Sequence, residues 1–435
     1  MAALAATGAF AQSSVTVYGG LDASGGQLKR TQSETGLNST TQKVTNLAGL
    51  NSSRATNLMG FRGTEDLGGG KTASFTYEFG LNAQNVATNG NLAAAGAGAN
   101  GGPFGQTRQA WIGLGDNNLG EVRLGSQNNL TVPIGGMSAA IQEAGLGGST
   151  MGQLNGLATT RNPLQIFGAT NNTFSTPGVV DGINSIAATL ANSYLSPVQG
   201  VSGPQPRYSN VLSYTSPTMM GFRASVQLVR EESSNPAGLD VNNTTGINGA
   251  VSKLNAQLFG LEYDNGPLAV KVLLTQKKLE AGRTADADGT AVAPDAAVDS
   301  NKVNHWVIAG SYNLGVATPY VIYHKGDNKF GTLDGAASTL KFATDGYELG
   351  MRVPVGAFTP YFSYSNGEWK ATATGVNTLT VKLKTMQVGT TYTMSKRTTL
   401  YAATGSSKFT ATEASVAGNA QDKLSGFRLG VSHSF

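Results

Sequence analysis

Three histidines, His305, His324 and His433, are the side chains best suited to acid–base or metal chemistry at neutral pH, and the chain has no cysteine. The histidines lie in separate segments, without the short spacing of a metal-binding motif. Only His433 has hydroxyl neighbours, Ser432 and Ser434, and in a strand these would point to the face opposite the histidine. We therefore expect no enzyme activity, no metal site and no bound cofactor.

Arginine suggests another kind of chemistry, the attraction of anions over a distance. Arg62, Arg108, Arg123 and Arg428 occur within segments that alternate apolar and polar residues, and Arg207 begins a further such segment. A guanidinium keeps its charge even when it is crowded, and a wall of low dielectric constant focuses its field. Together the five arginines would give an aqueous pore a positive wall. Any one of them could instead be a solvated residue, or one paired with a nearby acid.

The segments that carry these residues have the side-chain period of β-strands. In the last eleven residues, SGFRLGVSHSF, the apolar side chains of Phe427, Leu429, Val431 and Phe435 alternate with small or polar ones. About ten alternating residues are enough for a tilted strand to cross a bilayer, and a terminal aromatic residue fits the membrane interface. The segment is therefore expected to be the closing strand of an outer-membrane β-barrel.

Charged residues keep to the polar face of the predicted strands. In residues 72–79 Glu78 opposes the apolar side chains, and in residues 347–353 Glu348 and Arg352 do the same. A charge on the lipid face at mid-depth would cost about 2–4 kcal/mol, so a membrane would enforce this sorting.

Short clusters of turn-forming residues, such as DLGGG at 66–70 and DNGP at 264–267, separate pairs of these segments. Seven such turns, with one strand at each end of the chain, predict sixteen antiparallel strands. The residues between successive strand pairs require long loops at the opposite end of the barrel. The predicted strands are residues 14–28, 54–66, 71–83, 107–115, 120–128, 206–216, 221–231, 254–264, 268–278, 303–313, 317–326, 346–354, 358–368, 383–394, 398–408 and 424–435.

The fold class is thus predicted to be all-β, a transmembrane antiparallel barrel. Only 13% of the residues are charged, which is low for a soluble protein, and no long apolar run suggests a membrane helix. The net charge of +4 is too small to indicate nucleic-acid binding. Residues 1–11 are small and apolar and end in AFA, which is typical of signal-peptide cleavage. We expect them to be the remnant of a signal peptide, with residues 12–435 forming one barrel domain.

A long gap between two predicted strands covers residues 129–205. It is rich in small residues, and its only charged residues are Glu143, Arg161 and Asp181. An unstructured loop of this length inside a compact domain counts against an assignment unless the loop is packed. A barrel lumen offers such packing, so we expect at least the first part of the loop to fold inward. A loop that extends away from the barrel is the alternative.

Several motifs resemble those of the general porins of β-proteobacteria, of the Neisseria, Bordetella and Comamonas type. They are SVTVYGGLDA at 14–23, GFRGTEDLGGG at 60–70, RQAWIGL at 108–114, GEVRLGSQ at 120–127, and YTSP at 214–217 followed by GF at 221–222. With the closing strand, these motifs are spread over essentially the whole mature chain. Each motif alone is unspecific, but together they make the resemblance specific.

This resemblance implies a sixteen-stranded barrel in the bacterial outer membrane, a homotrimer, and a third extracellular loop folded inward to narrow the pore. It implies passive diffusion of small hydrophilic solutes and inorganic ions across a membrane of lipid and lipopolysaccharide. It also implies a constriction in which basic residues of the wall face the loop. The matching basic residues are Arg62, Arg108, Arg123, Arg207 and Arg428.

Family members usually place acidic residues on the inward loop, opposite the arginines. This chain departs from that pattern, because Glu143 and Asp181 are the only acids in the long gap. A basic wall with so few opposing acids predicts weak anion selectivity.

Two other functions stay open at this point. The same barrel could be a substrate-selective channel whose long third loop forms a binding path, and saturation of the flux would identify it. A secreted β-rich adhesin without a pore is the other alternative. The terminal phenylalanine and the absence of charge from the lipid faces speak against the adhesin.

Overall fold

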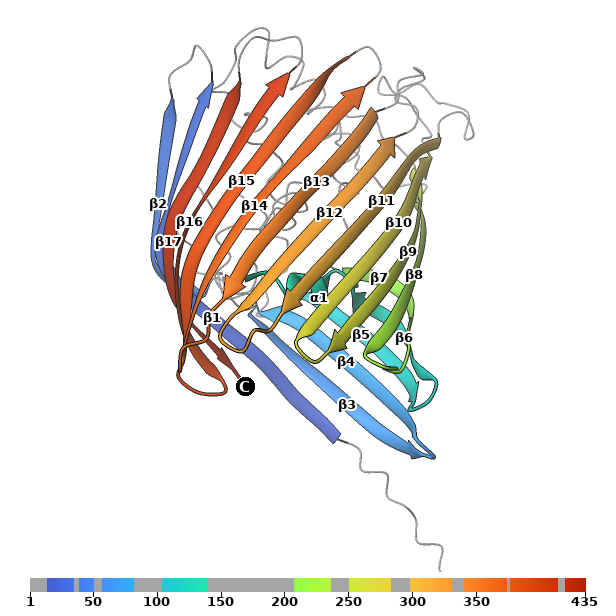
Figure 1. Cartoon of the computed structure of the whole chain (residues 1–435). Coiled ribbons are helices and arrows are strands. Elements are labelled where there is room, and N and C mark those ends of the chain that lie inside the picture. Colours follow the sequence, from blue (N-terminus) through green and yellow to red (C-terminus); the bar gives the residue numbers. More distant parts are fainter. Residues whose placement is uncertain are drawn as a thin grey trace, which may run out of the picture.

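The computed structural model describes residues 14–34, 39–50, 57–81, 104–139, 207–235, 250–282, 298–330, 340–373, 376–413 and 419–435. These residues form one antiparallel sheet that closes on itself into a barrel of slanted strands (Figure 1). The signal-peptide prediction for residues 1–11 and most of the predicted long loop lie outside the described residues.

Seventeen strand segments and one short helix make up the described structure. They are β1 (Ser14–Glu34), β2 (Thr40–Leu50), β3 (Leu58–Gly68), β4 (Lys71–Leu81), β5 (Phe104–Asp116), β6 (Gly120–Asn128), α1 (Val132–Gly135), β7 (Arg207–Thr215), β8 (Phe222–Asn235), β9 (Ala250–Asn265), β10 (Leu268–Gly282), β11 (Val298–Tyr312), β12 (Thr318–Phe330), β13 (Leu340–Arg352), β14 (Phe358–Ala373), β15 (Val376–Thr393), β16 (Thr398–Glu413) and β17 (Ala420–Ser434).

These segments occupy sixteen positions around the barrel, because β2 and β3 share one. β3 pairs with β1 from Ser14 to Gly20, and β2 pairs with β1 beyond that point, from Ala23 to Gln32. Every other strand pairs with its neighbours in sequence, and β17 pairs with β1 to close the ring. The last residue, Phe435, exchanges two backbone hydrogen bonds with Gly19, both of 3.1 Å. The predicted fold of about sixteen antiparallel strands is confirmed.

Each predicted strand overlaps an observed one, and 120–128 has the predicted bounds. The largest differences lie at the loop end, where most observed strands run several residues beyond the predicted ones, whereas β3 and β4 are shorter there than the predicted 54–66 and 71–83. β1 continues to Glu34 instead of residue 28, and β2, at Thr40–Leu50, was not predicted. Some of these extensions, such as KRTQSE at 29–34, are polar on both faces, so they lack the alternation that marks a strand between lipid and water. Others carry buried apolar side chains on the inner face, such as Trp369 in β14 and Val381 in β15.

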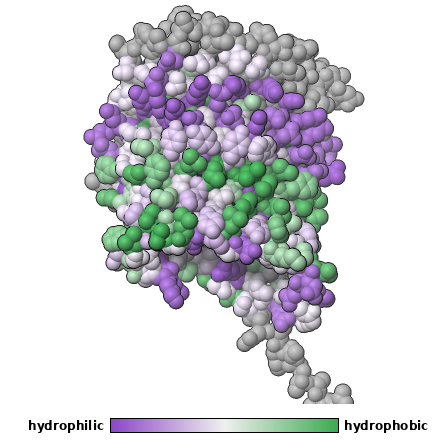
Figure 2. Space-filling view, in the orientation of Figure 1, coloured by the Kyte–Doolittle hydropathy of each residue, from purple (hydrophilic) through white to green (hydrophobic). Residues whose placement is uncertain are grey.

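The outer face of the barrel is apolar and exposed. Leu114 is 63% exposed, Ile112 60% and Leu429 58%, values that a soluble protein would avoid over so wide a surface. On the face of the barrel that Figure 2 shows, hydrophobic side chains form a band, with a hydrophilic zone above it. No helix among the described residues is long and apolar enough to cross a membrane.

The buried apolar cluster lies inside the barrel, where the chain after β6 turns inward. Ile134, Met137 and Ala139, in and just after α1, pack with inward side chains such as Leu258 of β9 and Leu273 of β10. All five are at least 92% buried, because their largest exposed fraction is 8%. The first part of the predicted long loop, residues 129–139, therefore folds into the lumen as expected.

Glycine at positive φ shapes the short-turn end of the barrel, where neighbouring chains approach closely. Gly120 begins β6 with φ +91°, and a Cβ there would lie 2.2 Å from the carbonyl oxygen of Thr215 in β7. Only glycine fits both conditions, since an L side chain would be strained and would also clash with backbone.

Candidate functional site

Four of the five predicted arginines lie on the same side of the lumen. Arg62 is in β3, Arg108 in β5, Arg123 in β6 and Arg207 in β7, so they occupy a run of five consecutive strands. We call these four residues the basic wall. Their strands belong to the β3–β8 group that Figure 1 shows at the lower right of the barrel.

The upper part of the basic wall is organised by Glu78 of β4, which is 6% exposed. Its Oε1 accepts a hydrogen bond of 2.6 Å from Nε of Arg108, and its Oε2 accepts one of 3.0 Å from the hydroxyl of Tyr18. The guanidinium of Arg62 lies over the ring of Tyr18, 5.1 Å from its centre. The buried carboxylate of Glu78 thus holds Arg108 by a direct hydrogen bond. It also holds the Tyr18 ring over which the Arg62 guanidinium stacks.

Arg207, the first residue of β7, adds a further charge to this group. It is close enough to Arg108 and Glu78 for their charges to act on it. Its Nε is buried and has no hydrogen-bond partner among the described residues. Glu78 is therefore bonded to Arg108 and acts on Arg207 through space.

The lower part of the basic wall is built around Arg123. Its guanidinium donates two hydrogen bonds to Glu121, of 2.9 and 2.5 Å, and lies 4.1 Å from the centre of the Trp111 ring. Glu121 also accepts a 2.6 Å hydrogen bond from Ser74. The stacking and the two hydrogen bonds hold Arg123 in one orientation toward the lumen.

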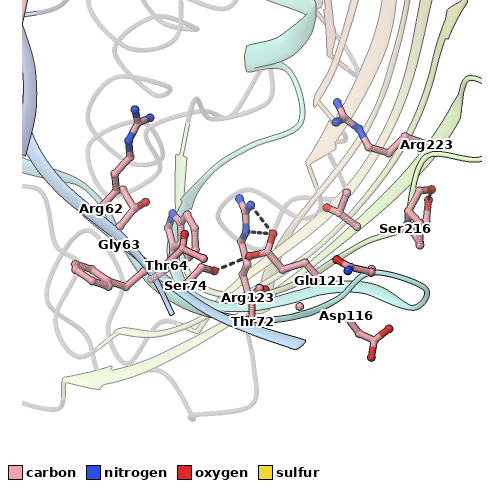
Figure 3. A pocket seen from close by; sticks show the side chains of 18 of the residues that line it. Arg62, Gly63, Thr64, Thr72, Ser74, Asp116, Glu121, Arg123, Ser216 and Arg223 are labelled. Carbon is pink, nitrogen blue, oxygen red and sulfur yellow. Dashed lines mark hydrogen bonds and ion pairs between the residues drawn. The ribbon is translucent and has the colours of Figure 1, made fainter. Parts of the chain in front are cut away.

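Arg62 and Arg123 of the basic wall help to line an open cavity of about 630 Å³ at the short-turn end of the lumen. In Figure 3 the side chains of Arg62, Arg123 and Arg223 rise from its wall in the same general direction. Polar residues such as Thr72 and Ser74 make up much of the remaining lining. At its rim a hydrogen bond of 2.8 Å from Lys71 lowers the pKa of the Asp116 carboxyl, which keeps this exposed pair charged.

A β-bulge gives Arg108 its inward position. The pairing of β4 with β5 shifts register so that Glu78 faces Gln109 while Phe79 faces Thr107. Without that shift, alternation would place Arg108 on the same face as Ala110 and Ile112, which is the lipid face. The extra residue in β5 therefore turns a lipid-facing position into one that reaches Glu78.

Sequence reasoning missed a second basic group beside the basic wall. Arg223 of β8 pairs with Glu262 of β9 at 2.5 Å, and Lys271 of β10 pairs with the same carboxylate at 3.3 Å. All three residues follow the inward parity of their strands. Their common face was a usable signal, but cross-strand register was needed to bring them together.

The inward start of the long loop is held by another missed residue, Glu348 of β13, which is 1% exposed. Its Oε1 accepts hydrogen bonds from the hydroxyls of Ser138 at 2.5 Å, Tyr320 at 2.8 Å and Ser363 at 3.0 Å. Tyr320 in turn accepts a hydrogen bond of 2.9 Å from the backbone of Ala139. Glu348 thus links the chain after α1 to the inner wall of β12–β14, and we call these contacts the loop anchor.

Arg352 supports the loop anchor from the same strand. It donates a 2.8 Å hydrogen bond to the carbonyl of Met137, and its guanidinium lies 5.4 Å from the centre of the Tyr320 ring. On the opposite side of the lumen, Gln227 donates a 2.9 Å hydrogen bond to the carbonyl of Asn128. The loop is therefore tied to the wall at both its departure from β6 and its passage across the lumen.

The remaining predicted residues lie apart from the basic wall or outside the described chain. Arg428 is half-buried on the inner face of β17, opposite Gly26 of β1, whereas Arg62 faces Thr16 near the start of β1. Along β1, Arg428 is thus ten residues (26 minus 16) further toward the loop end than Arg62. Glu143 and Asp181 lie outside the described residues.

The charges on this side of the lumen do not balance. Above the turns, the inner wall from β3 to β7 carries the four guanidiniums of the basic wall against the carboxylates of Glu78 and Glu121. The excess is therefore two positive charges, which an ion in the lumen would meet on one side.

Two of the three histidines are buried side by side on the inner face. His305 is 3% exposed and His324 1%, and their ring centres are 5.8 Å apart. His433 is exposed, and its Nδ1 lies 2.9 Å from the hydroxyl of Thr398. Within the described residues no three histidine, aspartate or glutamate side chains converge as metal ligands.

Comparisons with known proteins agree with this architecture. The model of a family described as Gram-negative porin matches residues 1–412. An outer membrane porin protein of Bordetella pertussis is 26% identical over 358 residues, which is 79% of this chain and 74% of that protein. Outer membrane porin protein 32 of Delftia acidovorans is 26% identical over 416 residues, 92% of this chain and 86% of that protein.

Solved structures show the same fold at lower identity. An anion-selective porin from Comamonas acidovorans is 22% identical, with a TM-score of 0.56 over 98% of this chain and 100% of that one. The outer membrane channel DcaP of Acinetobacter baumannii is 10% identical, with a TM-score of 0.52 over 97% of each chain.

Proposed function

Because this chain belongs to the Gram-negative porin family, and is thus an outer-membrane channel, we propose that it admits small hydrophilic anions in preference to cations. The observation that carries this proposal is the excess of two positive charges on the basic wall. The carboxylates of Glu78 and Glu121 offset only part of the field of the four guanidiniums. The lipid-embedded wall has a low dielectric constant, so that field extends across the aqueous lumen instead of being screened at its surface.

The residues of the basic wall act by position and charge alone. A passing anion is attracted to Arg62 and Arg207, whose charges are the less compensated ones, and it keeps most of its hydration. Arg108 and Arg123 are held rigidly by their carboxylates, so they define the shape of the wall. Passive flux of ions and small solutes follows, with no step that makes or breaks a covalent bond.

The loop anchor sets the free cross-section of the lumen in this proposal. Glu348 and Arg352 hold residues 137–139 against the wall of β12–β14, on the side away from the basic wall. The anion path then lies between the basic wall and residues 137–139. Glu143 and Asp181, outside the described residues, are proposed as the few opposing charges of the long loop.

We also propose the partners of the barrel. The family membership supports a homotrimer, and the exposed apolar outer face supports contact with outer-membrane lipid and lipopolysaccharide.

The experiment that tests the proposal is a reversal-potential measurement on single channels in a planar bilayer under a KCl gradient. The expected result is a reversal potential on the chloride side, with openings in groups of three for a trimer. A reversal potential that shows a preference for potassium would refute the proposed anion selectivity, but it would not contradict the assignment as a channel. A flux that saturates for one solute class would favour the alternative, a substrate-selective channel on the same barrel.

A further inference from the structure

Two imidazoles and one hydroxyl form a small cluster on the inner face of β10, β11 and β12. His305 of β11 is directly opposite Thr275 of β10, and His324 of β12 occupies the inward position diagonal to His305. Their side chains are deeply buried, because His305 is 3% exposed, Thr275 2% and His324 1%. None of the three belongs to the basic wall or to the loop anchor. We call these three residues the histidine cluster.

The histidine cluster contains buried polar atoms that the described part of the protein does not satisfy. Neither ring nitrogen of His305 has a hydrogen-bond partner within the described residues, and the same holds for the hydroxyl oxygen of Thr275. Buried polar atoms in folded proteins are nearly always hydrogen-bonded, so an unsatisfied group points to a bound water or ion. Two such side chains directly opposite each other are therefore evidence of a ligand at this place on the wall.

The spacing of the two rings suits a shared transition-metal ion. The ring centres of His305 and His324 are 5.8 Å apart, and the ring planes are inclined by 40°. A zinc–imidazole bond of about 2.0–2.1 Å places the ion about 3 Å from the centre of the ring, so two rings that share an ion have centres about 5–6 Å apart. The observed separation lies within that range.

Glycines on the neighbouring strands make room for both rings. A Cβ on Gly326 of β12 would lie 2.7 Å from Cδ2 of His305, and one on Gly346 of β13 would lie 2.8 Å from Nε2 of His324. Both separations are shorter than Cβ contacts in proteins, so any other residue would displace the ring beside it. Glycine at both positions thus lets the two imidazoles lie against the wall, side by side.

The charged side chains beside the histidine cluster permit a cation. Lys277 of β10 is close enough to Glu231 of β8 for that carboxylate to act on its charge. Glu348 of β13 occupies the inward position diagonal to His324. The two carboxylates therefore more than offset the single ammonium group.

We propose that the histidine cluster binds one divalent transition-metal ion of the zinc, nickel or copper type. One nitrogen of His305 and one of His324 coordinate the ion, and water completes its coordination. The hydroxyl of Thr275 forms a hydrogen bond with that water and so supports the site from the next strand. Neutral imidazole suits these metals, whereas Mg²⁺ and Ca²⁺ prefer oxygen ligands. The bound ion joins β11 to β12.

This site departs from the expectation of no metal site, which depended on spacing along the sequence. His305 and His324 are 19 positions apart (324 minus 305), so they form no short motif. The register of β11 against β12 is what brings them together. The ion acts through its bonds to the wall, so the proposal is separate from the anion preference of the basic wall.

The test measures Zn²⁺ binding to the refolded full-length chain, without a polyhistidine tag, by isothermal titration calorimetry. His305→Phe keeps a ring over Gly326 and removes both nitrogens, and His433→Phe is the matched control at the exposed histidine of β17. Loss of a ligand should weaken binding at least as much as loss of an outer-shell partner, so His305→Phe is expected to bind Zn²⁺ about 100-fold more weakly. The control is expected to bind as the parent does, with one Zn²⁺ per chain.

Three outcomes would overturn the proposal. Equal Zn²⁺ affinity of the parent and His305→Phe would place the ion elsewhere. Absence of Zn²⁺ binding by the parent would assign the unsatisfied atoms to water. Mg²⁺ bound as tightly as Zn²⁺ would show that imidazole is not the ligand, since Mg²⁺ takes oxygen ligands.

A spectroscopic readout keeps the proposal testable if His305→Phe refolds poorly. The chain has three histidines, so the His433→Phe control retains only the two of the histidine cluster. One equivalent of Cu²⁺ bound to this control is expected to give an electron paramagnetic resonance spectrum with coupling to two imidazole nitrogens. A spectrum without that coupling would contradict the proposal.

Thermal unfolding gives an independent check on the same variants. With a chelator present, His305→Phe is expected to melt at the same or a higher temperature than the parent, because unsatisfied buried nitrogens have been removed. With Zn²⁺ present the order is expected to reverse, because the ion stabilises only a protein that binds it. A melting temperature that Zn²⁺ raises equally in both proteins would refute the site.

Discussion

Neutralising Glu121 is expected to increase the preference for anions, although nothing positive is added. Its carboxylate lies 2.5 Å from Arg123 and offsets that charge. For an ion passing roughly 5 Å away in water, one unit charge contributes about 0.8 kcal/mol, and screening at 0.1 M salt reduces this to about 0.5 kcal/mol. The energy changes in opposite directions for chloride and potassium, so their permeability ratio should shift by about 1 kcal/mol, or about fivefold.

Three variants test this prediction, because they should shift the chloride-to-potassium permeability ratio in different directions. Glu121→Gln should raise the chloride-to-potassium permeability ratio about fivefold, and Arg123→Gln should lower it by a similar factor. The double variant should return close to the parent ratio. The glutamine at 121 can still accept the hydrogen bond from Ser74, and Arg123 keeps its place over Trp111, so the wall retains its shape.

The assay is the reversal potential at 0.1 M and again at 1 M mean KCl. At 1 M the Debye length is about 3 Å, so each shift should fall below about twofold. The reasoning is refuted if Glu121→Gln leaves the ratio unchanged or lowers it. It is also refuted if the shifts are as large at 1 M as at 0.1 M, since field effects through water must be screened.

Two further predictions concern stability, and both are measured by denaturant-induced unfolding of the refolded protein. Glu348→Ala removes the acceptor of three buried hydroxyls in the loop anchor, so it should lower the free energy of unfolding by about 3 kcal/mol or more and make single-channel currents noisier. Glu368→Ala, in an outward-facing ion-pair group, should lower the free energy of unfolding by about 1 kcal/mol or less. Equal costs would show that the anchor contributes no more than a surface pair. Gly120→Ala should be more destabilising than Gly266→Ala by about 1–3 kcal/mol, because both glycines have positive φ but only Gly120 has backbone within 2.2 Å of a new Cβ. A cost at Gly266 equal to that at Gly120 would mean that strain of φ alone governs these turns.

The membrane-spanning part of the fold was predictable because lipid on one face and water on the other impose a strict two-residue pattern. Strand 120–128 was predicted to the residue for this reason. Beyond the membrane both faces meet water, so β2 and the outer part of β1 carry no such pattern. Their pairing depends on backbone hydrogen bonds, which every sequence can make.

The candidate site was predictable at the level of faces and not of contacts. Arg123 follows strand parity directly, and its inward position could be derived. Arg108 reaches Glu78 only through a register shift in the pairing of β4 and β5, and the sequence of that segment does not predict the shift. Glu348 had been placed on the polar face, but its role depends on Ser138, which lies 210 positions away in sequence.

The hydrogen bonds between Gly19 and Phe435 have a consequence for how this chain acquires its structure. The two residues are 416 positions apart (435 minus 19), so the ring closes through a contact between its first and last strands. No fragment that leaves the ribosome first can contain both edges of the sheet, and contacts of such high sequence separation form slowly. The ring can therefore close only after β17 has been synthesised, and until then the unpaired strand edges need protection from aggregation.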